Sequence, residues 1–308
     1  MSTGFRMDMD GADRTAGGTS GGTTHDLRGL LGFLGLSVDA EAGGGSLVVG
    51  PHLLNSGRTL WGGCGLAAAI AVTESILDRG CVWATVQYVS PIQAGACLNL
   101  QLEVGQHGRN LSQVAVRGMI NGRLALLATG TFGGSTDGSS TDGGPTVDGG
   151  VQFADPPDDV PGPPDCPPRT HTSSGRSVAE AGGMLARIEQ RWARPPRSTL
   201  DGSPGSGRAI LWARLNQPMA TSTASVAILA DLAPAAVIDA VGRPVYTLSL
   251  DNSLRVGRLA QTDWMLVDAQ VEAVIGGVAQ VSARIFDENG QLITTADQSA
   301  KLLPPRTS

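Results

Sequence analysis

Two stretches of the chain are apolar or small at almost every position, unlike the alternating and polar segments around them. The longer stretch covers Ala224–Val241, and the other covers Leu66–Leu77. A helix that is apolar on all sides has no face suited to water, so each stretch predicts a helix enclosed by other structure. The hydroxyl cluster Thr221–Thr223 supplies N-cap oxygens for the longer helix, and Gly242 is expected to end it.

Runs in which apolar and polar residues alternate flank each apolar helix and predict strands. A short amphipathic helix is predicted over 25–36, whereas the pattern of 186–193 fits either a strand or a helix. The Asn121-Gly122 pair predicts a tight hairpin. The predicted strands are 46–54, 81–89, 96–104, 111–119 and 124–132 in the first half, and 209–215, 245–250, 264–273, 278–286 and 291–303 in the second.

The order of elements repeats, because each half has a preliminary strand, a long apolar helix and then four strands. Two sequence echoes support a duplication: SQVAVR at 112–117 resembles AQVSAR at 279–284, and NGRL at 121–124 resembles NGQL at 289–292. Both echoes have an offset close to 167 residues. Two unrelated hairpins could also look alike, so this alternative stays open.

Composition divides the chain into folded and unfolded parts. Residues 1–25 are rich in Gly, Ser, Thr and Asp and are predicted to be a disordered tail. Eight of the 18 prolines lie between Pro145 and Pro168, which favours an exposed linker over 133–185. The two predicted domains are therefore 26–132 and 186–303.

Charge and cysteine content exclude several classes of function. The formal net charge is −6 and no basic run occurs, so we expect no nucleic-acid partner. The four cysteines lack metal-ligand spacing, and neither a metal nor a cofactor is expected. The N-terminus lacks a secretory signal and Asp231 and Asp239 interrupt the longest apolar run, so a cytoplasmic protein without membrane spans is expected. The charged fraction of 16% predicts a homo-oligomer whose outer sheet faces pack together.

An apolar helix followed by a four-strand meander predicts an α+β fold in which a curved antiparallel sheet wraps a central helix. Two such units could join edge to edge and so remove exposed strand edges. Six short segments of the sequence resemble segments of a known family. They are LWGGCG at 60–65, VQYVSPIQAG at 86–95, GRNLS at 108–112, ADL at 230–232, SLDNS at 249–253 and DQS at 297–299. On these segments the chain resembles the double-hotdog acyl-CoA thioesterases of the acyl-CoA thioesterase II (TesB-like) family.

The resemblance implies a catalytic set in the second half: Asp231, Ser249 and Gln298, acting together on one water. Asp231 also stands out on its own, because a lone carboxylate inside an apolar helix is costly to bury and is a candidate general base. An isolated acid of this kind is often structural, and that alternative remains. Asp251, two residues after Ser249 on the same strand face, is a rival or supporting residue.

The comparable acid of the first half is Glu74, which is expected at the exposed end of its helix. Family members often have His at the position of Asn252, so this chain departs from the pattern there.

The family resemblance leaves three functions to weigh. The leading one is hydrolysis of acyl-CoA to a free fatty acid and coenzyme A, by water attack, because no GxSxG nucleophile motif occurs. A hotdog protein that binds acyl-CoA without turnover is the second. Hydration or dehydration of acyl thioesters is the third, and it is disfavoured because none of the four histidines lies near Asp231 in the sequence.

Overall fold

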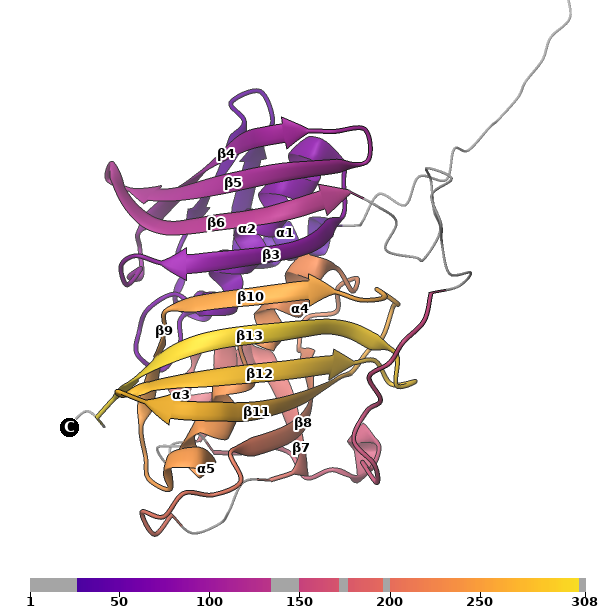
Figure 1. The fold of residues 1–308 in the computed structure, drawn as a ribbon. Helices are drawn as coiled ribbons and strands as arrows, with labels where there is room; N and C mark the ends of the chain where they lie inside the picture. The colour runs from indigo at the N-terminus through magenta and orange to yellow at the C-terminus, as the bar shows by residue number, and fades with distance from the viewer. Residues whose placement is uncertain (1–26, 134–149, 172–176, 196–199, 305–308) are drawn as a thin grey trace, which may run out of the picture.

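The computed structural model describes residues 27–133, 150–171, 177–195 and 200–304. Within these residues, 13 strands form one antiparallel sheet, and in the view of Figure 1 helices α1, α2 and α4 lie behind it. The elements of the first half are α1 (Arg28–Leu34), β1 (Leu36–Asp39), β2 (Gly44–Val48), a 3₁₀ helix (Pro51–Leu53), α2 (Gly62–Leu77), β3 (Cys81–Tyr88), β4 (Cys97–His107), β5 (Leu111–Ile120) and β6 (Arg123–Gly133).

The second half begins with two short segments that follow the proline-rich region. Its elements, with those that precede it, are a 3₁₀ helix (Pro163–Asp165), α3 (Val178–Ala181), a 3₁₀ helix (Gly183–Arg187), β7 (Ile188–Arg194), β8 (Arg208–Leu215), α4 (Thr223–Ala230), a 3₁₀ helix (Ala233–Ala236), α5 (Val237–Val241), β9 (Tyr246–Ser249), β10 (Asp251–Val256), β11 (Met265–Ile275), β12 (Val278–Phe286) and β13 (Leu292–Leu303). The undecided segment 186–193 is therefore mainly the strand β7.

The order of strands across the sheet is β1-β2-β4-β5-β6-β3-β10-β13-β12-β11-β8-β7, with β9 paired to β13 off this path. The two halves thus have the same order in opposite directions. They meet where β3 pairs with β10, with Val86 opposite Asn252 and Thr85 opposite Ser253. The echoed sequences at 112–117 and 279–284 occupy the equivalent strands β5 and β12. This arrangement is what a duplicated unit with edge-to-edge sheets requires.

Helix α2 is buried from Gly62 to Glu74, as its uniformly apolar sequence predicts. Helix α4 is also buried throughout and begins with a capping box in which Ser222 and Ser225 exchange hydrogen bonds. The segment 223–241 is long and apolar enough, by length and composition alone, to cross a membrane. However, 72% of that window is buried inside the protein, which is typical of a core helix.

The prediction of one continuous helix over 224–241 is wrong. Helix α4 ends at Ala230, Asp231 takes a non-helical conformation, and a 3₁₀ helix and α5 follow. Pro234 lies in the first turn of that 3₁₀ helix, where its missing N–H costs no hydrogen bond. In the interior of an α-helix the same residue would lose a hydrogen bond, so α4 cannot continue through it. The break places the Asp231 carboxylate at the end of a helix instead of on its side.

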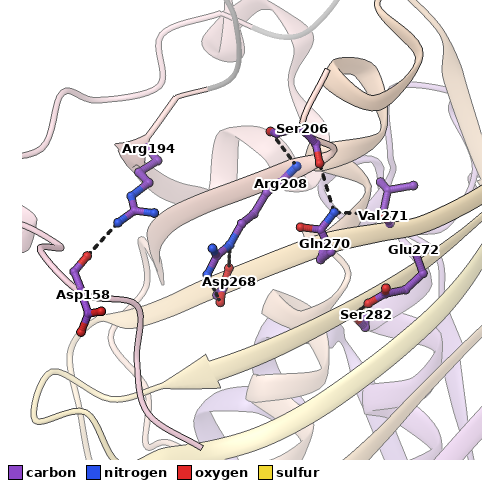
Figure 2. A network of polar contacts seen from close by, with 9 residues as sticks. All are labelled: Asp158, Arg194, Ser206, Arg208, Asp268, Gln270, Val271, Glu272 and Ser282. Carbon is purple, nitrogen blue, oxygen red and sulfur yellow. Dashed lines mark hydrogen bonds and ion pairs between the residues drawn. The ribbon is translucent and has the colours of Figure 1, made fainter. Parts of the chain in front are cut away.

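The described part of the predicted linker over 133–185 is not a free connector, because several of its residues pack on the second half. Residues 150–171 pack on the second half, where Cys166 is buried together with Trp212, Trp264 and Phe286. The Trp212 indole donates to the carbonyl of Pro161 at 2.8 Å. Arg194 donates to the carbonyl of Asp158 at 2.7 Å, as Figure 2 shows beside the Arg208–Asp268 ion pair. The segment 150–171 therefore shields apolar side chains of β8 and β11 from water.

The C-terminal end of the predicted linker 133–185 is folded. Residues 177–185 form α3 and the start of a 3₁₀ helix, with Met184 and Leu185 buried. The 134–149 and 172–176 parts of the linker, and the disordered tail predicted over 1–25, lie outside the described residues.

Deleting residues 150–170 and closing the gap with a short flexible linker should destabilise the protein. The deletion exposes the small core around Cys166 and Trp212, so we expect the Tm to fall by roughly 10 °C. Deleting 134–148 is the matched control and should leave the Tm within a few degrees. Equal Tm values for the two deletions, measured by scanning calorimetry, would show that the 150–171 segment contributes nothing to the core.

Candidate active site

The Asp231 carboxylate lies at the contact between the two central helices. Its side chain is buried, with 7% of the residue exposed, and it faces the first turn of α2. The helices can approach closely here because Gly62 and Gly63 have no side chains. A Cβ at Gly63 would lie 2.5 Å from the carbonyl oxygen of Ala227 in α4. The two glycines therefore position α2 so that its N-terminus points at Asp231.

Hydrogen-bond donors from four elements surround this carboxylate. The backbone N–H of Gly63 donates to Oδ2 at 3.0 Å, and the Nε2 of Gln298 donates to Oδ1 at 2.7 Å. The Nδ2 of Asn252 lies 3.1 Å and the hydroxyl of Ser249 lies 3.5 Å from Oδ1. The donors come from α2, β13, β10 and β9, so both halves hold Asp231.

The structure thus brings together the three residues that the sequence placed in one site. Gln298 links the other two, because its Nε2 also donates to the Ser249 hydroxyl at 2.6 Å. Strands β9 and β13 are paired, with Ser249 opposite Ala300, two residues beyond Gln298. That register sets the Ser249 and Gln298 side chains side by side.

Burial raises the pKa of Asp231 from 3.8 to about 6. The N–H donors of Gly63, Asn252, Gln298 and Gly62 oppose that rise because they favour the ionised form. The positive end of the α2 dipole acts in the same direction. The carboxylate is therefore ionised at pH 7 and can accept a proton, and its conjugate acid can return that proton near neutral pH.

Two amide oxygens beside Asp231 have no hydrogen-bond partner in the described part of the protein. Both Gln298 and Asn252 direct their NH₂ groups to the carboxylate, which leaves Gln298 Oε1 and Asn252 Oδ1 buried without a donor. Each of them can accept a hydrogen bond from water.

Glu74 is not part of this site, and the expectation that it lies at the exposed end of α2 is wrong. It is buried, because α2 ends in a left-handed turn at Asp78 and β3 then folds back over this part of the helix. Its Oε1 accepts from the N–H of Cys81 at 3.0 Å, while Oε2 has no partner among the described residues. Burial raises its pKa to about 7. At 1.5 Å per residue, Glu74 lies about 16 Å along α2 from Gly63.

Asp251 has a structural contact instead of a direct one to the carboxylate. Its Oδ1 accepts from the N–H of Ser299 at 2.6 Å and so ties β10 to β13 next to Gln298. The described contacts of Asp231 do not include Asp251.

Sequence reasoning missed the roles of Asn252, Gly63 and Tyr88. Asn252 and Leu254 are the buried positions of β10, so strict alternation was the signal that pointed Asn252 inward. The Tyr88 hydroxyl hydrogen-bonds the carbonyl of Gly62 and accepts from Asn252 at 3.5 Å. No sequence signal indicated that Gly63 donates to Asp231, because the two residues are 168 positions apart.

A pocket of about 590 Å³ opens onto Asp231 between the two halves. One wall comes from the second half and is largely apolar; the other is largely polar and comes from the first half together with Arg169 of the connecting segment. The apolar wall contains Leu232, Pro234, Ala235, Ile238, Val245 and Leu248; the polar residues are Asn55, Ser56, Arg58, Thr59, Gln93 and Arg169. Across the described part of the chain no cluster of three or more His, Cys, Asp and Glu could hold a metal ion.

Two family models cover this architecture. The model of the acyl-CoA thioesterase N-terminal domain matches residues 51–133, and that of the acyl-CoA thioesterase C-terminal domain matches residues 124–302. The chain belongs to the acyl-CoA thioesterase family. The chain is thus an enzyme of the thioester-hydrolase class, and acyl-CoA is the substrate class that the family implies. No curated protein sequence matches the chain.

Solved structures agree with this assignment. A protein from Novosphingobium aromaticivorans assigned as a thioesterase is 33% identical, with a TM-score of 0.72 over 88% of this chain and 98% of that one. The tesB protein of Mycobacterium avium subsp. paratuberculosis is 19% identical, with a TM-score of 0.66 over 90% and 99%. A hotdog-fold protein from Alicyclobacillus acidocaldarius is 20% identical, with a TM-score of 0.70 over 88% and 96%. The last two show the hotdog fold alone.

Proposed function

We propose that this thioesterase hydrolyses acyl-CoA to a free fatty acid and coenzyme A by attack of a water that Asp231 activates. The observation that carries the proposal is the convergence of Asp231, Ser249 and Gln298 within 2.6–3.5 Å of one another. The three residues come from separate elements, and Asp231 borders a pocket large enough for part of the substrate.

The reaction follows from the protonation state of the carboxylate. Asp231 takes a proton from water as the water oxygen bonds to the thioester carbonyl carbon. The tetrahedral intermediate then collapses, the C–S bond breaks, and the proton on Asp231 passes to the departing thiolate. Ser249 orients the water, and Gln298 holds both Ser249 and Asp231 in position. The positive end of α2 favours the negative charge that develops on the carbonyl oxygen.

We further propose a double-hotdog layout with one active centre per chain. Helices α2 and α4 occupy equivalent places in the two halves, whose strand orders run in opposite directions across the sheet. In α2 the position that corresponds to Asp231 is Ala69 or Ile70, so the first half has no equivalent acid. The first half instead supplies the N-terminus of α2 and one wall of the pocket.

The pH dependence of hydrolysis tests the proposed base. Because only the ionised carboxylate can accept the proton, kcat/KM should fall about tenfold per pH unit below the Asp231 pKa of about 6. Above that pH the profile should be flat. The measurement is thiol release between about pH 4.5 and pH 8.5. A profile that rises steadily with pH and has no inflection would indicate hydroxide attack without a base.

A homo-oligomer is also proposed, with contacts across outer sheet faces. Several large apolar side chains on the strands are exposed, including Val48 at 60% and Ile275 at 77%. Multi-angle light scattering at micromolar concentration should therefore give a multiple of the 31.5 kDa chain mass. A mass close to that of one chain would contradict the proposal.

A further inference from the structure

Arg169 lies in the segment that connects the two halves, yet it lines the same pocket as Asp231. Backbone pairing fixes its place: the N–H of Arg169 donates to the carbonyl of Gln190, and the N–H of Trp192 donates to the carbonyl of Pro167. Its guanidinium lies over the Trp192 ring, 5.4 Å from the centroid. The side chain is thus held in one position before substrate arrives.

The described groups that accept hydrogen bonds from this guanidinium are neutral. Nη1 donates to Gln190 Oε1 at 2.7 Å and Nε donates to the carbonyl of His171 at 3.3 Å. Among the described residues, none of the ion pairs involves Arg169. Burial lowers its pKa to about 10, with no carboxylate to raise it. A cation that is partly buried without a counter-ion is costly unless an anion binds there.

A second guanidinium, that of Arg58, borders the same pocket from the first half. Arg58 lies in the loop before α2, and Asn55 holds that loop by accepting from Gly57 at 2.8 Å and from Thr59 at 3.2 Å. Arg58 is exposed and, like Arg169, forms no ion pair in the described part of the chain. Among the residues that the structure describes, Asp231 is the only carboxylate that lines the pocket. The polar wall therefore carries two cations that no described acid neutralises.

We propose that Arg169 and Arg58 bind the phosphate groups of coenzyme A and so direct the acyl end of the substrate to Asp231. This proposal rests on the proposed function, because it takes acyl-CoA as the substrate of this pocket. Guanidinium groups bind phosphate oxygens through paired, charge-assisted hydrogen bonds. The segment 150–171 then has a role in binding as well as in covering β8 and β11.

The test compares two thioesters of the same acyl group, one on coenzyme A and one on N-acetylcysteamine, which has no phosphate. Arg169→Gln should raise KM for the acyl-CoA and Kd for free coenzyme A roughly tenfold, with kcat nearly unchanged. KM for the N-acetylcysteamine thioester should not change. Arg58→Gln should act in the same direction, and Arg169→Lys should recover part of the loss. Arg194→Gln is the matched control, because Arg194 binds the same segment outside the pocket.

Three results would overturn the assignment. An equal rise of KM for both thioesters would show that Arg169 acts only on the shape of the pocket. An unchanged Kd for coenzyme A in Arg169→Gln, measured by calorimetry, would place the phosphates elsewhere. A third substrate is an N-acetylcysteamine thioester whose acyl chain ends in a carboxylate. If Arg169→Gln and Arg58→Gln raised KM for this substrate alone, the two arginines would bind the acyl group instead of the phosphates. Binding of coenzyme A does not require hydrolysis, so these results stay distinguishable from failure of the Asp231 mechanism.

Discussion

Replacing Asp231 with Asn should lower kcat for acyl-CoA hydrolysis about 10²–10⁴-fold. The amide keeps the size of the carboxylate but cannot accept the proton from water. The carboxylate does not bind the coenzyme A moiety in this account, so Kd for coenzyme A should change little. The measurement is steady-state thiol release, with Kd determined separately by calorimetry. Turnover at the wild-type rate would show that another group is the base.

Replacing Ser249 or Gln298 should lower kcat less than replacing Asp231 does. Ser249→Ala removes the hydroxyl proposed to orient the water, and Gln298→Ala removes two hydrogen bonds of 2.6 and 2.7 Å that hold Ser249 and Asp231. Because these groups act as one unit, the loss in the double variant should be smaller than the product of the two single losses. A fully multiplicative loss would show that Ser249 and Gln298 act independently.

Replacing Gly63 with Ala should damage both stability and catalysis. The new Cβ would lie 2.5 Å from the Ala227 oxygen and 2.7 Å from the Ile228 Cα, and both are backbone atoms that cannot rotate away. Helices α2 and α4 must separate, at a cost of about 1–3 kcal/mol in the free energy of unfolding. Separation also lengthens the hydrogen bond from the Gly63 N–H to Asp231, so kcat should fall in the protein that remains folded.

Gly32→Ala in α1 is the matched control for this effect. A Cβ at Gly32 meets nothing within 4 Å, and alanine favours a helix more than glycine does. The free energy of unfolding, measured by urea denaturation, should stay unchanged or rise slightly. Equal effects of the two substitutions would show that the close helix contact at Gly63 is not what positions Asp231.

The sequence was informative wherever local pattern decides the structure. The apolar run of α2, the Asn121-Gly122 hairpin and the N-cap cluster at Thr221–Thr223 each act over a few residues, and each forms the predicted element. Within the candidate catalytic set, Ser249 and Gln298 came from the family resemblance alone, whereas local pattern also indicated Asp231. A carboxylate inside an apolar run is unusual enough in the sequence to single out Asp231 without any knowledge of its partners.

What the sequence did not predict depends on contacts between distant segments. The N–H of Gly63 meets Asp231 only after the halves join through β3 and β10. Residues 150–171 have the composition of a linker, and only the apolar face of β8 shows that they must pack. The position of Arg169 in the pocket follows from that packing. Glu74 was misplaced because a helix pattern does not show which end later strands cover.

The most direct test of the account is the rate of thiol release in a single turnover, with enzyme in excess over acyl-CoA, for Asp231→Asn beside Glu74→Gln. Both substitutions neutralise a buried carboxylate with a raised pKa, but only Asp231 borders the pocket. Asp231→Asn should slow the chemical step at least a hundredfold, while folded Glu74→Gln should retain most of its rate. A wild-type rate for Asp231→Asn together with a slow Glu74→Gln would place the active centre in the first half and contradict the account.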